Sequence, residues 1–388
     1  MITEIKINNF KSVADLTLPL GRFNVLIGAN GSGKSNILEA IAFGGAASAD
    51  KLDNEFLGSR GIRTANAQLM KSAFSKDYLS NPIQLNFKNA AKEIKFNIEE
   101  EDKPILKWII HEKKELENKY TNSFLYLFDR EDSDSQSPAE LSVEKINDIL
   151  KFRKQYDDTL KSLIDDARVE TFYNAELANF IIYSPEISSL RKFEEESQIK
   201  PLGVKGEGLF SVLQIFYENY PEETINEIRK YLHIIDWFDD FEAIFDRVSG
   251  RKSLVVKDKN ILGVTLNQTN VNEGFLFLLF YISLIISKET PAFFAIDNIE
   301  ASLHPLLCEE LIKNLVELSK VHNKQIILTT HNPFVLDGLD LTDPEQKLFV
   351  VRRNADGETI ADPIKPVKNG KLSEAWVRGR IGGNPETI

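Results

Sequence analysis

The sequence predicts an α/β fold in which strands and helices alternate around a mixed or parallel sheet, with a helical lobe inserted in the middle of the chain. Three observations support this prediction. An apolar run at residues 23–27 leads into a glycine-rich loop and then a helical pattern. From about residue 181 onward, strand-length apolar runs alternate with helical patterns, which is typical of a layered fold with parallel strands. The stretch between these two parts is charged and has helical spacing.

The length and composition fit a globular chain of one large or two ordinary domains. The protein has 388 residues, of which 42% are hydrophobic and 27% charged, so fibrous and largely disordered classes are excluded. The single cysteine, Cys308, excludes an intramolecular disulfide framework and a cysteine-based zinc site. The N-terminus lacks the pattern of a signal peptide, and the most apolar run, Phe275–Ile286, is shorter than the ~20 residues that cross a bilayer. We therefore expect a cytoplasmic protein that has no membrane contact.

The net charge of −12 gives the molecule a field that repels polyanions. This charge argues against non-specific nucleic-acid binding over the whole surface. A local basic patch is a candidate in the C-terminal stretch, where a solvated surface of mixed charge is the alternative interpretation. The basic residues of that stretch are Lys347, Arg352, Arg353, Lys365, Lys368, Lys371, Arg378 and Arg380.

The first part of the chain, residues 1–95, is predicted to form a strand-rich lobe that contains a glycine-rich turn followed by a helix. Apolar residues at alternating or continuous positions indicate strands at 2–7, 16–20, 23–27, 82–87 and 94–98. A helix is expected from Ser35 to about Phe43.

The middle part, residues 96–180, is predicted to be a helical insertion. Apolar residues between 143 and 164 recur near i, i+3, i+4 and i+7, and the segment 130–138 is a polar, low-complexity loop. The insertion is too short for a long coiled-coil arm.

The last part, residues 181–388, alternates the two patterns. We expect helices at 206–217, 222–232, 272–287 and about 305–320, and strands at 254–257, 263–266, 292–296, 325–328, 347–352 and 359–364.

A phosphate-binding loop follows the third strand. Residues 28–35, GANGSGKS, match G-x-x-x-x-G-K-[ST] between a strand and a helix. The glycines allow a turn whose N–H groups face a phosphate, and the following helix adds the positive end of its dipole. In this chemistry Lys34 bridges the β- and γ-phosphates and Ser35 is a ligand of Mg²⁺. The loop therefore predicts ATP and Mg²⁺ as cofactors, with nucleotide contacts from Gly28, Asn30, Gly31, Ser32, Gly33, Lys34 and Ser35.

An acidic residue follows a second apolar strand. Asp297 comes directly after residues 293–296, where a phosphate-loop protein places its Mg²⁺-linked carboxylate. The next residue is Asn298, whose amide is a poor proton acceptor. Glu300 is the candidate general base, if the turn brings it within ~3 Å of the attacking water. The alternative is that Asn298 and Glu300 cap a helix starting near Ser302.

A histidine follows a third strand. His331 comes after residues 326–328 and two threonines, a position from which it can contact a γ-phosphate. Together with the two preceding motifs in chain order, it is interpreted as a phosphate sensor. His304 is interpreted as structural.

These motifs together resemble the ABC-type ATPases of the RecF, SMC and OLD group, and within it the small stand-alone members of the AAA-21-like type. The stretch from Glu4 to Ile41, with its NFKS and GANGSGKS motifs, is similar to the opening of that family. IDNIEASLHP (Ile296–Pro305) resembles its Walker B and D-loop segment, and TTHNP (Thr329–Pro333) its histidine switch. The resemblance covers about residues 1–95 and 180–388, and implies a P-loop ATPase head with an N-terminal antiparallel β lobe.

The resemblance also implies a signature motif and a pair of heads. Asn272 and Gly274 precede the apolar helix at 275–286, with Asn in place of the usual Ser. The alternative interpretation is that Asn272 is only the N-cap of this helix. In the family this motif completes the ATP site of a partner subunit, which implies a homodimer or higher oligomer. Lys11 of the NFKS motif and Asn36 are included among the nucleotide-binding residues. The glutamine of the Q-loop has no clear counterpart, and Tyr183–Pro185 is a candidate for its position.

Two departures from the family pattern indicate slow hydrolysis. Asn298 replaces the usual Glu, and Asn272 replaces the usual Ser. About 55 residues follow His331, fewer than the Toprim nuclease domain of OLD-type proteins needs. The resemblance therefore implies an ATPase that works with a separately encoded effector, such as a nuclease, often in anti-phage defence. The alternatives are an ATP-bound scaffold that holds a toxic effector without catalysis, and a RecF-like repair ATPase, for which DNA or RNA would be a partner.

Overall fold

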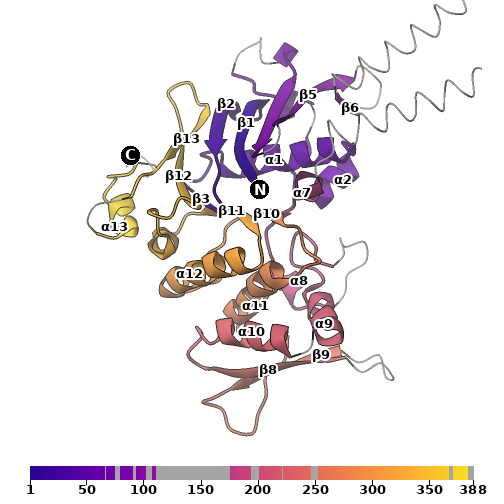
Figure 1. Ribbon diagram of the computed structural model, residues 1–388, viewed down its shortest axis with the longest axis vertical. Coiled ribbons are helices and arrows are strands. Elements are labelled where there is room, and N and C mark those ends of the chain that lie inside the picture. The colour runs from indigo at the N-terminus through magenta and orange to yellow at the C-terminus, as the bar shows by residue number, and fades with distance from the viewer. Residues whose placement is uncertain are drawn as a thin grey trace, which may run out of the picture.

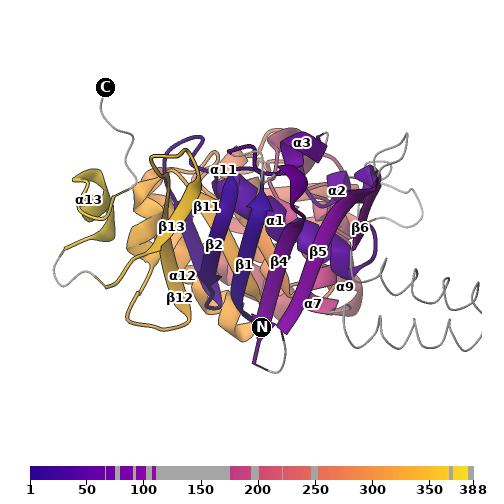
Figure 2. The same ribbon diagram turned by 90° about the horizontal axis from the view of Figure 1, so that it is seen from above.

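The computed structural model describes residues 1–65, 67–74, 79–90, 93–101, 107–110, 175–193, 201–220, 222–245, 252–366 and 370–382. Two sheets lie one above the other with helix α1 (Lys34–Ser48) between them, and further helices cover the far side of the second sheet (Figures 1 and 2). The helices that the spacing predicts between residues 143 and 164, and the polar loop at 130–138, lie outside the described residues.

The first sheet is antiparallel, with strand order β2-β1-β4-β5-β6. Its strands are β1 (Ile2–Phe10), β2 (Val13–Pro19), β4 (Ile83–Asn89), β5 (Glu93–Glu101) and β6 (Lys107–Ile110). The alternating burial of β2 and β4 turns their apolar side chains toward α1 and their polar side chains to solvent. The predicted strands of this lobe are therefore present. Strand β6, however, occupies residues that the sequence analysis assigned to the helical insertion, so the sheet continues past residue 95.

The second sheet is mixed, with strand order β13-β12-β3-β11-β10-β7. Its strands are β3 (Phe23–Ile27), β7 (Ile182–Tyr183), β10 (Phe293–Ile296), β11 (Gln325–Thr330), β12 (Gln346–Arg353) and β13 (Thr359–Pro363). All its neighbouring pairs are parallel except β12 with β13. Because β3 comes from the first part of the chain and the other strands from the last part, the two ends of the chain build one sheet.

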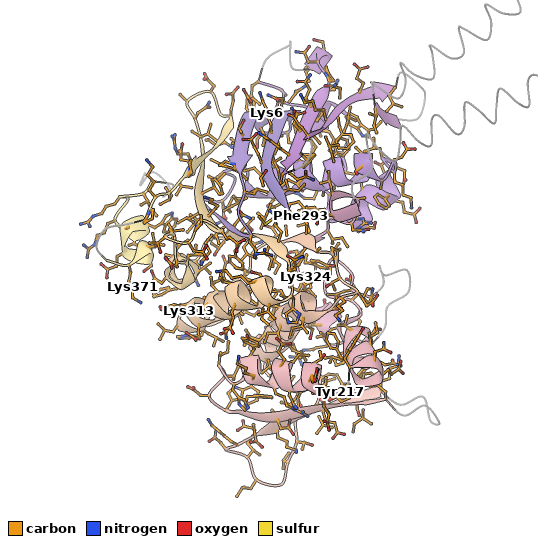
Figure 3. All side chains as sticks on the ribbon, in the orientation of Figure 1. Lys6, Tyr217, Phe293, Lys313, Lys324 and Lys371 are labelled. Carbon is orange, nitrogen blue, oxygen red and sulfur yellow. The ribbon has the colours of Figure 1, made fainter. Side chains whose placement is uncertain are left out.

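Both faces of the second sheet are buried, which explains why its strands are continuous apolar runs in the sequence. Val25 faces one hydrophobic cluster with the helices of the last part, while Leu26 faces another with α1 and the first sheet. Phe293 of β10 belongs to the cluster between the two sheets (Figure 3).

The helices of the last part pack on the outer face of the second sheet. They are α9 (Leu209–Asn219), α10 (Glu223–Leu232), α11 (Glu273–Ile286) and α12 (Pro305–Val321), with the short elements α2 (Asn54–Ser59), α3 (Ala67–Met70), α7 (Ala175–Ala178), α8 (Ile187–Leu190) and η2 (Pro333–Gly338) elsewhere. Helix α11 is buried along nearly its whole length, so its apolar run is a core helix. No helix among the described residues is both long and apolar enough to span a membrane.

A two-stranded hairpin, β8 (Phe238–Phe245) with β9 (Lys252–Asp258), lies at the end of the molecule remote from the first sheet (Figure 1). The sequence analysis predicted β9 but missed β8. A register shift between Phe238 and Asp240 breaks the period-two pattern that would have shown it. The strand predicted at 263–266 is absent, because only Leu266 forms a single bridge, to Val256, and Gly263 adopts a left-handed turn conformation.

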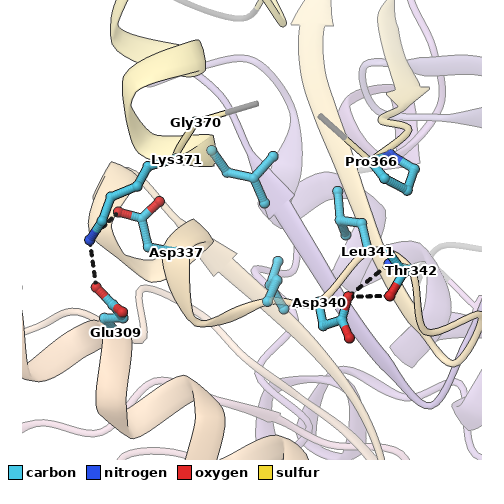
Figure 4. Close-up of a pocket in the computed structure, with 10 residues that line it drawn as sticks. Glu309, Asp337, Asp340, Leu341, Thr342, Pro366, Gly370 and Lys371 are labelled. Carbon is cyan, nitrogen blue, oxygen red and sulfur yellow. Dashed lines mark hydrogen bonds and ion pairs between the residues drawn. The ribbon is translucent and has the colours of Figure 1, made fainter. Parts of the chain in front are cut away.

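The C-terminal helix α13 (Leu372–Val377) docks on η2 and α12 (Figure 4). Asp337 of η2 is 2% exposed and accepts hydrogen bonds from Ser373 N (2.9 Å) and Ser373 Oγ (2.6 Å), while Lys371 pairs with Glu309 at 3.1 Å. These contacts fix the C-terminal segment to the element that follows His331.

Candidate nucleotide site

The segments that follow four parallel strands emerge at one edge of the second sheet. Ile27 of β3 lies opposite Thr330 of β11, and Ile296 of β10 lies between Leu328 and Tyr183 of its two neighbours. The phosphate loop, Asp297, His331 and Ser184 therefore meet at the carboxyl edge, where open α/β sheets bind ligands. The structure brings Lys34, Ser35, Asp297 and His331 together.

The phosphate loop has a backbone that requires glycine at two positions. Gly31 and Gly33 have φ of 76° and 106°, in the left-handed region. A Cβ at Gly28 would lie 2.1 Å from the carbonyl oxygen of Val351, so no larger residue fits there either. Helix α1 begins at Lys34 with no side-chain cap. The N–H groups of its first turn thus face the loop, which is a favourable site for an anion.

Lys34 lies inside this loop. Its side chain is 5% exposed, and Nζ donates to the carbonyl oxygens of Gly28 (2.8 Å) and Ala29 (3.0 Å). Burial lowers the pKa of Lys34 to about 8, partly offset by Asp297 and Glu300, whose carboxylates raise it. The ammonium is therefore charged at neutral pH and lies among groups that a phosphate can replace.

Asp297 faces Ser35 and Thr329. Ser35 Oγ donates to Asp297 Oδ2 at 3.1 Å, and Thr329 Oγ1 donates to Oδ1. Thr329 is fully buried and also accepts from the backbone N–H of Asn298 at 2.9 Å. The sequence analysis assigned no role to Thr329. Its position two residues before His331, at the end of a strand, was the available signal.

These residues fit a nucleoside triphosphate with Mg²⁺. The paired oxygens of Ser35 and Asp297 are the ligand type that Mg²⁺ prefers, completed by phosphate and water. The hydroxyl of Ser32 is buried and has no hydrogen-bond partner among the described residues, as expected of a group directed at a ligand. In the part of the chain that the structure describes, no three His, Cys, Asp or Glu side chains gather as an independent metal site.

Glu300 holds the segment around His331. Its carboxylate accepts from Thr330 Oγ1 (2.8 Å) and from the backbone N–H of His331 (2.7 Å). The alternative that Glu300 and Asn298 cap the next helix is wrong, because α12 begins at Pro305 and is capped by His304, whose Nδ1 accepts from Leu306 N. Hence His304 is structural, as predicted. Glu300 lies at the carboxyl edge of the second sheet, beside His331.

Asn298 turns the chain between Asp297 and Glu300. It is exposed and has φ of 58°, a left-handed conformation that Asn tolerates better than most residues. This conformation is a physical reason for an amide at this position. The turn carries Glu300 back toward His331.

His331 lies beside Lys34, with 3.4 Å between Nδ1 and Nζ. Burial and the Lys34 ammonium lower the pKa of His331, against a smaller opposing effect of Glu300. The imidazole is therefore neutral at pH 7, and can either donate or accept a hydrogen bond.

Asn272 and Gly274 form the N-terminal turn of helix α11. Asn272 caps α11 by accepting from Gly274 N at 2.7 Å. The turn packs on Ser302, whose hydroxyl donates to Glu273 at 3.2 Å. The N-cap role is thus present, and a contact of Asn272 and Gly274 with a nucleotide stays a prediction.

Lys11 and Asn36 belong to a polar network beside the loop. Lys11 pairs with Glu39, which is 2% exposed and also accepts from Arg63. Asn36 donates to Ser12 Oγ at 2.6 Å. Burial lowers the pKa of Lys11, offset by Glu39. The buried Glu39 was not recognised in the sequence, because a lone acid within a helix carries no signal.

Tyr183 lies on the edge strand beside Asp297, whose backbone N–H donates to its carbonyl at 2.8 Å. Ser184 therefore starts a loop at the carboxyl edge of the second sheet. Gln84, a glutamine that could be considered for the Q-loop, lies instead on strand β4 of the first sheet. That Tyr183–Pro185 occupies the Q-loop position stays a prediction.

Three of the seven described residues of the predicted basic patch form ion pairs. Arg352 pairs with Asp362, Lys371 with Glu309 and Arg378 with Glu374. Lys368 lies outside the described residues. These pairs favour the interpretation as a surface of mixed charge.

The AAA ATPase domain family matches residues 1–336 of the chain. Because this match covers most of the protein, the chain belongs to that family of ATPases. The fold is similar to the SmcHead bound to the C-winged helix domain of ScpA, with 17% identity, a TM-score of 0.53, and coverage of 94% of this chain and 98% of that chain. It is also similar to the Smc head domain with an extended coiled coil bound to the C-terminal domain of ScpA from Pyrococcus furiosus, with 15% identity, a TM-score of 0.51 and 98% coverage of both chains.

Two curated relatives match shorter segments. The DNA replication and repair protein RecF of Brucella abortus is 51% identical over 43 residues, which are 11% of this chain and 11% of RecF. The uncharacterized protein MJECL44 of Methanocaldococcus jannaschii is 32% identical over 107 residues, 26% of this chain and 32% of that protein. The chain therefore spans about a tenth of RecF and a third of MJECL44. The family match identifies an ATPase domain, and the similarity of the fold to SMC heads confirms the predicted fold class.

Proposed function

We propose that the protein binds MgATP at the carboxyl edge of its second sheet and hydrolyses it slowly. The observation that carries this proposal is the convergence of residues that follow three different strands: Lys34 Nζ lies 3.4 Å from His331 Nδ1, and the adjacent Ser35 Oγ lies 3.1 Å from Asp297 Oδ2. The membership in an ATPase family supports the same conclusion.

The residues have distinct roles in this proposal. Lys34 leaves the carbonyls of Gly28 and Ala29 and bridges the β- and γ-phosphates. Ser35 and Asp297 hold Mg²⁺, which neutralises phosphate charge. Glu300 accepts the proton of the attacking water, and its two existing hydrogen bonds hold it at the γ-phosphate end. His331, neutral at pH 7, donates a hydrogen bond to the γ-phosphate.

In this proposal, turnover is slow because of the hydrogen bonds that Glu300, the general base, already accepts. Glu300 accepts from two protein donors, and these bonds occupy carboxylate oxygens that the attacking water would need. A catalytically faster arrangement would require Glu300 to release one of these donors. Binding of a partner near η2 could provide such a change.

A second copy completes the site in this proposal. Asn272 and Gly274 of one head contact the nucleotide of the other, so ATP closes a homodimer. The closed dimer regulates a separately encoded effector, for which a nuclease in an anti-phage system is the leading candidate. The alternative is an ATP-held scaffold without turnover, which the amide at Asn298 favours.

A RecF-like role with DNA is the further alternative, favoured by the short match to RecF. The net charge of −12 counts against it, because phosphate contacts dominate affinity for DNA. Salt-dependent DNA binding that ATP strengthens would support this role over the regulatory one.

Titration of a fluorescent ATP analogue with Mg²⁺ tests the site, and sedimentation of the same samples tests the dimer. We expect Lys34→Ala to weaken binding about thirtyfold or more, since a buried charge contact is lost. Lys313→Ala is the matched control, because Lys313 pairs with Glu309 on the exposed side of α12. Equal affinity of parent and Lys34→Ala would refute the site, and a monomer at saturating ATP would refute the paired heads.

A further inference from the structure

The hairpin of β12 and β13 lies directly beside the phosphate loop. Strand β12 runs parallel to β3, with Val350 opposite Ile27, so both strands end at the same edge of the sheet. The chain then turns at residues 354–358 and returns as β13, which starts at Thr359. The described C-terminal part of the chain thus supplies one wall of the loop, more than 300 residues away in sequence.

Three residues of this hairpin contact four residues of the loop. The carbonyl of Val351 closes the space at Gly28. Arg353 Nε donates to the carbonyl oxygen of Gly31 at 2.9 Å. Thr359 Oγ1 donates to the carbonyl oxygen of Ser32 at 3.0 Å, and Thr359 fills the space that a Cβ on Gly33 would need.

These contacts orient the loop's N–H groups, because a peptide unit is planar and trans. The carbonyl of Ser32 and the N–H of Gly33 belong to one such unit and point in opposite directions. Since Thr359 holds that carbonyl from outside the loop, the N–H of Gly33 points inward. Arg353 holds the carbonyl of the unit that joins Gly31 and Ser32, whose N–H donates to the carbonyl oxygen of Ala29 at 3.3 Å within the loop.

The Thr359 hydroxyl, which donates to the carbonyl oxygen of Ser32, is itself oriented by a chain of hydrogen bonds. Asn36 Nδ2 donates to Ser12 Oγ at 2.6 Å, and Ser12 Oγ lies 2.7 Å from Thr359 Oγ1. Because the Thr359 hydroxyl donates to Ser32, the Ser12 hydroxyl must donate to Thr359. Such chains polarise one another and strengthen each bond. The chain starts in helix α1 and ends on the loop, so it couples the two to the hairpin.

We propose that Thr359 and Arg353 are positioning residues for the phosphate loop: Thr359 aims the N–H of Gly33 at the phosphates of the nucleotide, and Arg353 holds the loop backbone at Gly31 in the conformation that this requires. The proposal rests on the proposed function, since it specifies how the same site is preorganised. Neither residue belongs to a sequence motif of the loop, and both come from the hairpin.

The test measures affinity for MgATP by titration, with thermal unfolding of each variant as a second readout. Thr359→Val keeps the shape but removes the donor, and Thr359→Ser restores it. Arg353→Ala removes an exposed side chain, so it leaves the core intact. Arg352→Ala is its matched control, because the neighbouring Arg352 pairs with Asp362 and does not contact the loop.

We expect Thr359→Val to bind MgATP about tenfold more weakly and Arg353→Ala about fivefold, as for the loss of one hydrogen bond from a preorganised site. Thr359→Ser and Arg352→Ala should stay within about twofold of the parent. Parental affinity in Thr359→Val and Arg353→Ala, with or without a lower melting temperature, would overturn the inference. If the parent itself does not bind MgATP, the proposed function fails instead, which separates the two outcomes.

Discussion

Thr329 offers the most direct test of how the fold positions the magnesium carboxylate. Its hydroxyl donates to Asp297 and accepts from the N–H of Asn298, and the side chain is fully buried. Thr329→Val has nearly the same shape and neither hydrogen bond. The substitution therefore isolates the hydroxyl.

The magnitude follows from the two lost bonds. A hydrogen bond to a charged group contributes about 1.5–3 kcal/mol, and a neutral one about 0.5–1.5 kcal/mol. Asp297 keeps its bond from Ser35 at 3.1 Å, so part of the first loss is offset. We expect the free energy of unfolding to fall by about 2–3 kcal/mol. The dependence of ATP affinity on Mg²⁺ should also weaken, because the carboxylate is free to rotate.

Urea unfolding of the parent, Thr329→Val and Thr329→Ser measures the first effect, and ATP titration at several Mg²⁺ concentrations measures the second. Thr342→Val is the control, because the Thr342 hydroxyl donates to Asp340 in an exposed loop and its loss should cost less than ~1 kcal/mol. A stability of Thr329→Val within that same range, with parental Mg²⁺ dependence, would refute the reasoning.

Three further predictions concern the loop, its lysine and the C-terminal helix. Gly33→Ala should abolish binding of the ATP analogue, because its φ is 106° and the new Cβ would lie 2.0 Å from Thr359 Oγ1; retained affinity would contradict the loop geometry. Affinity for ATP should fall above pH 8, where Lys34 loses its proton, and a flat titration to pH 10 would contradict that assignment. In the same window the contribution of Lys34 to stability rises with pH, since its folded pKa lies below its unfolded value and the unfolded chain binds more protons. Ser373→Ala should lower the free energy of unfolding by about 1–3 kcal/mol and speed hydrogen exchange in α13, because the 2.6 Å bond to buried Asp337 is lost; parental exchange would exclude this docking contact.

The sequence predicts those parts of the site that are local in the chain. The loop at 28–35 is recognisable because strand, glycines and helix follow one another, and Asp297 and His331 are recognisable because each ends an apolar strand. Parallel pairing then brings them to one edge, which the topology alone requires.

The remaining parts depend on contacts that no local pattern encodes. Thr359 meets Ser32 across 327 residues, and a threonine at the start of a strand looks the same whether or not it holds a phosphate loop. In the sequence, Glu39 is indistinguishable from any acidic residue of a helix. Only the structure shows that Lys11 and Arg63 both pair with it. Strand β8 was missed because its bulge disrupts the alternation that marks a half-buried strand.

Glu300 shows an intermediate case. Its place after Asp297 made it a candidate base, but the left-handed turn at Asn298 that directs it to Thr330 and His331 was not predictable from composition. The structure replaces the capping alternative with a position at the nucleotide edge. Proton acceptance by Glu300 stays a prediction.

The measurement that tests the central claim most directly is ATP turnover of the purified protein, with Lys34→Ala and Glu300→Gln compared with the parent. The account predicts slow turnover by the parent, loss of nucleotide binding in Lys34→Ala, and in Glu300→Gln a fall of about 100-fold in rate with ATP still bound. Parental turnover in Glu300→Gln would contradict its role as the base, and parental turnover in Lys34→Ala would contradict the site itself.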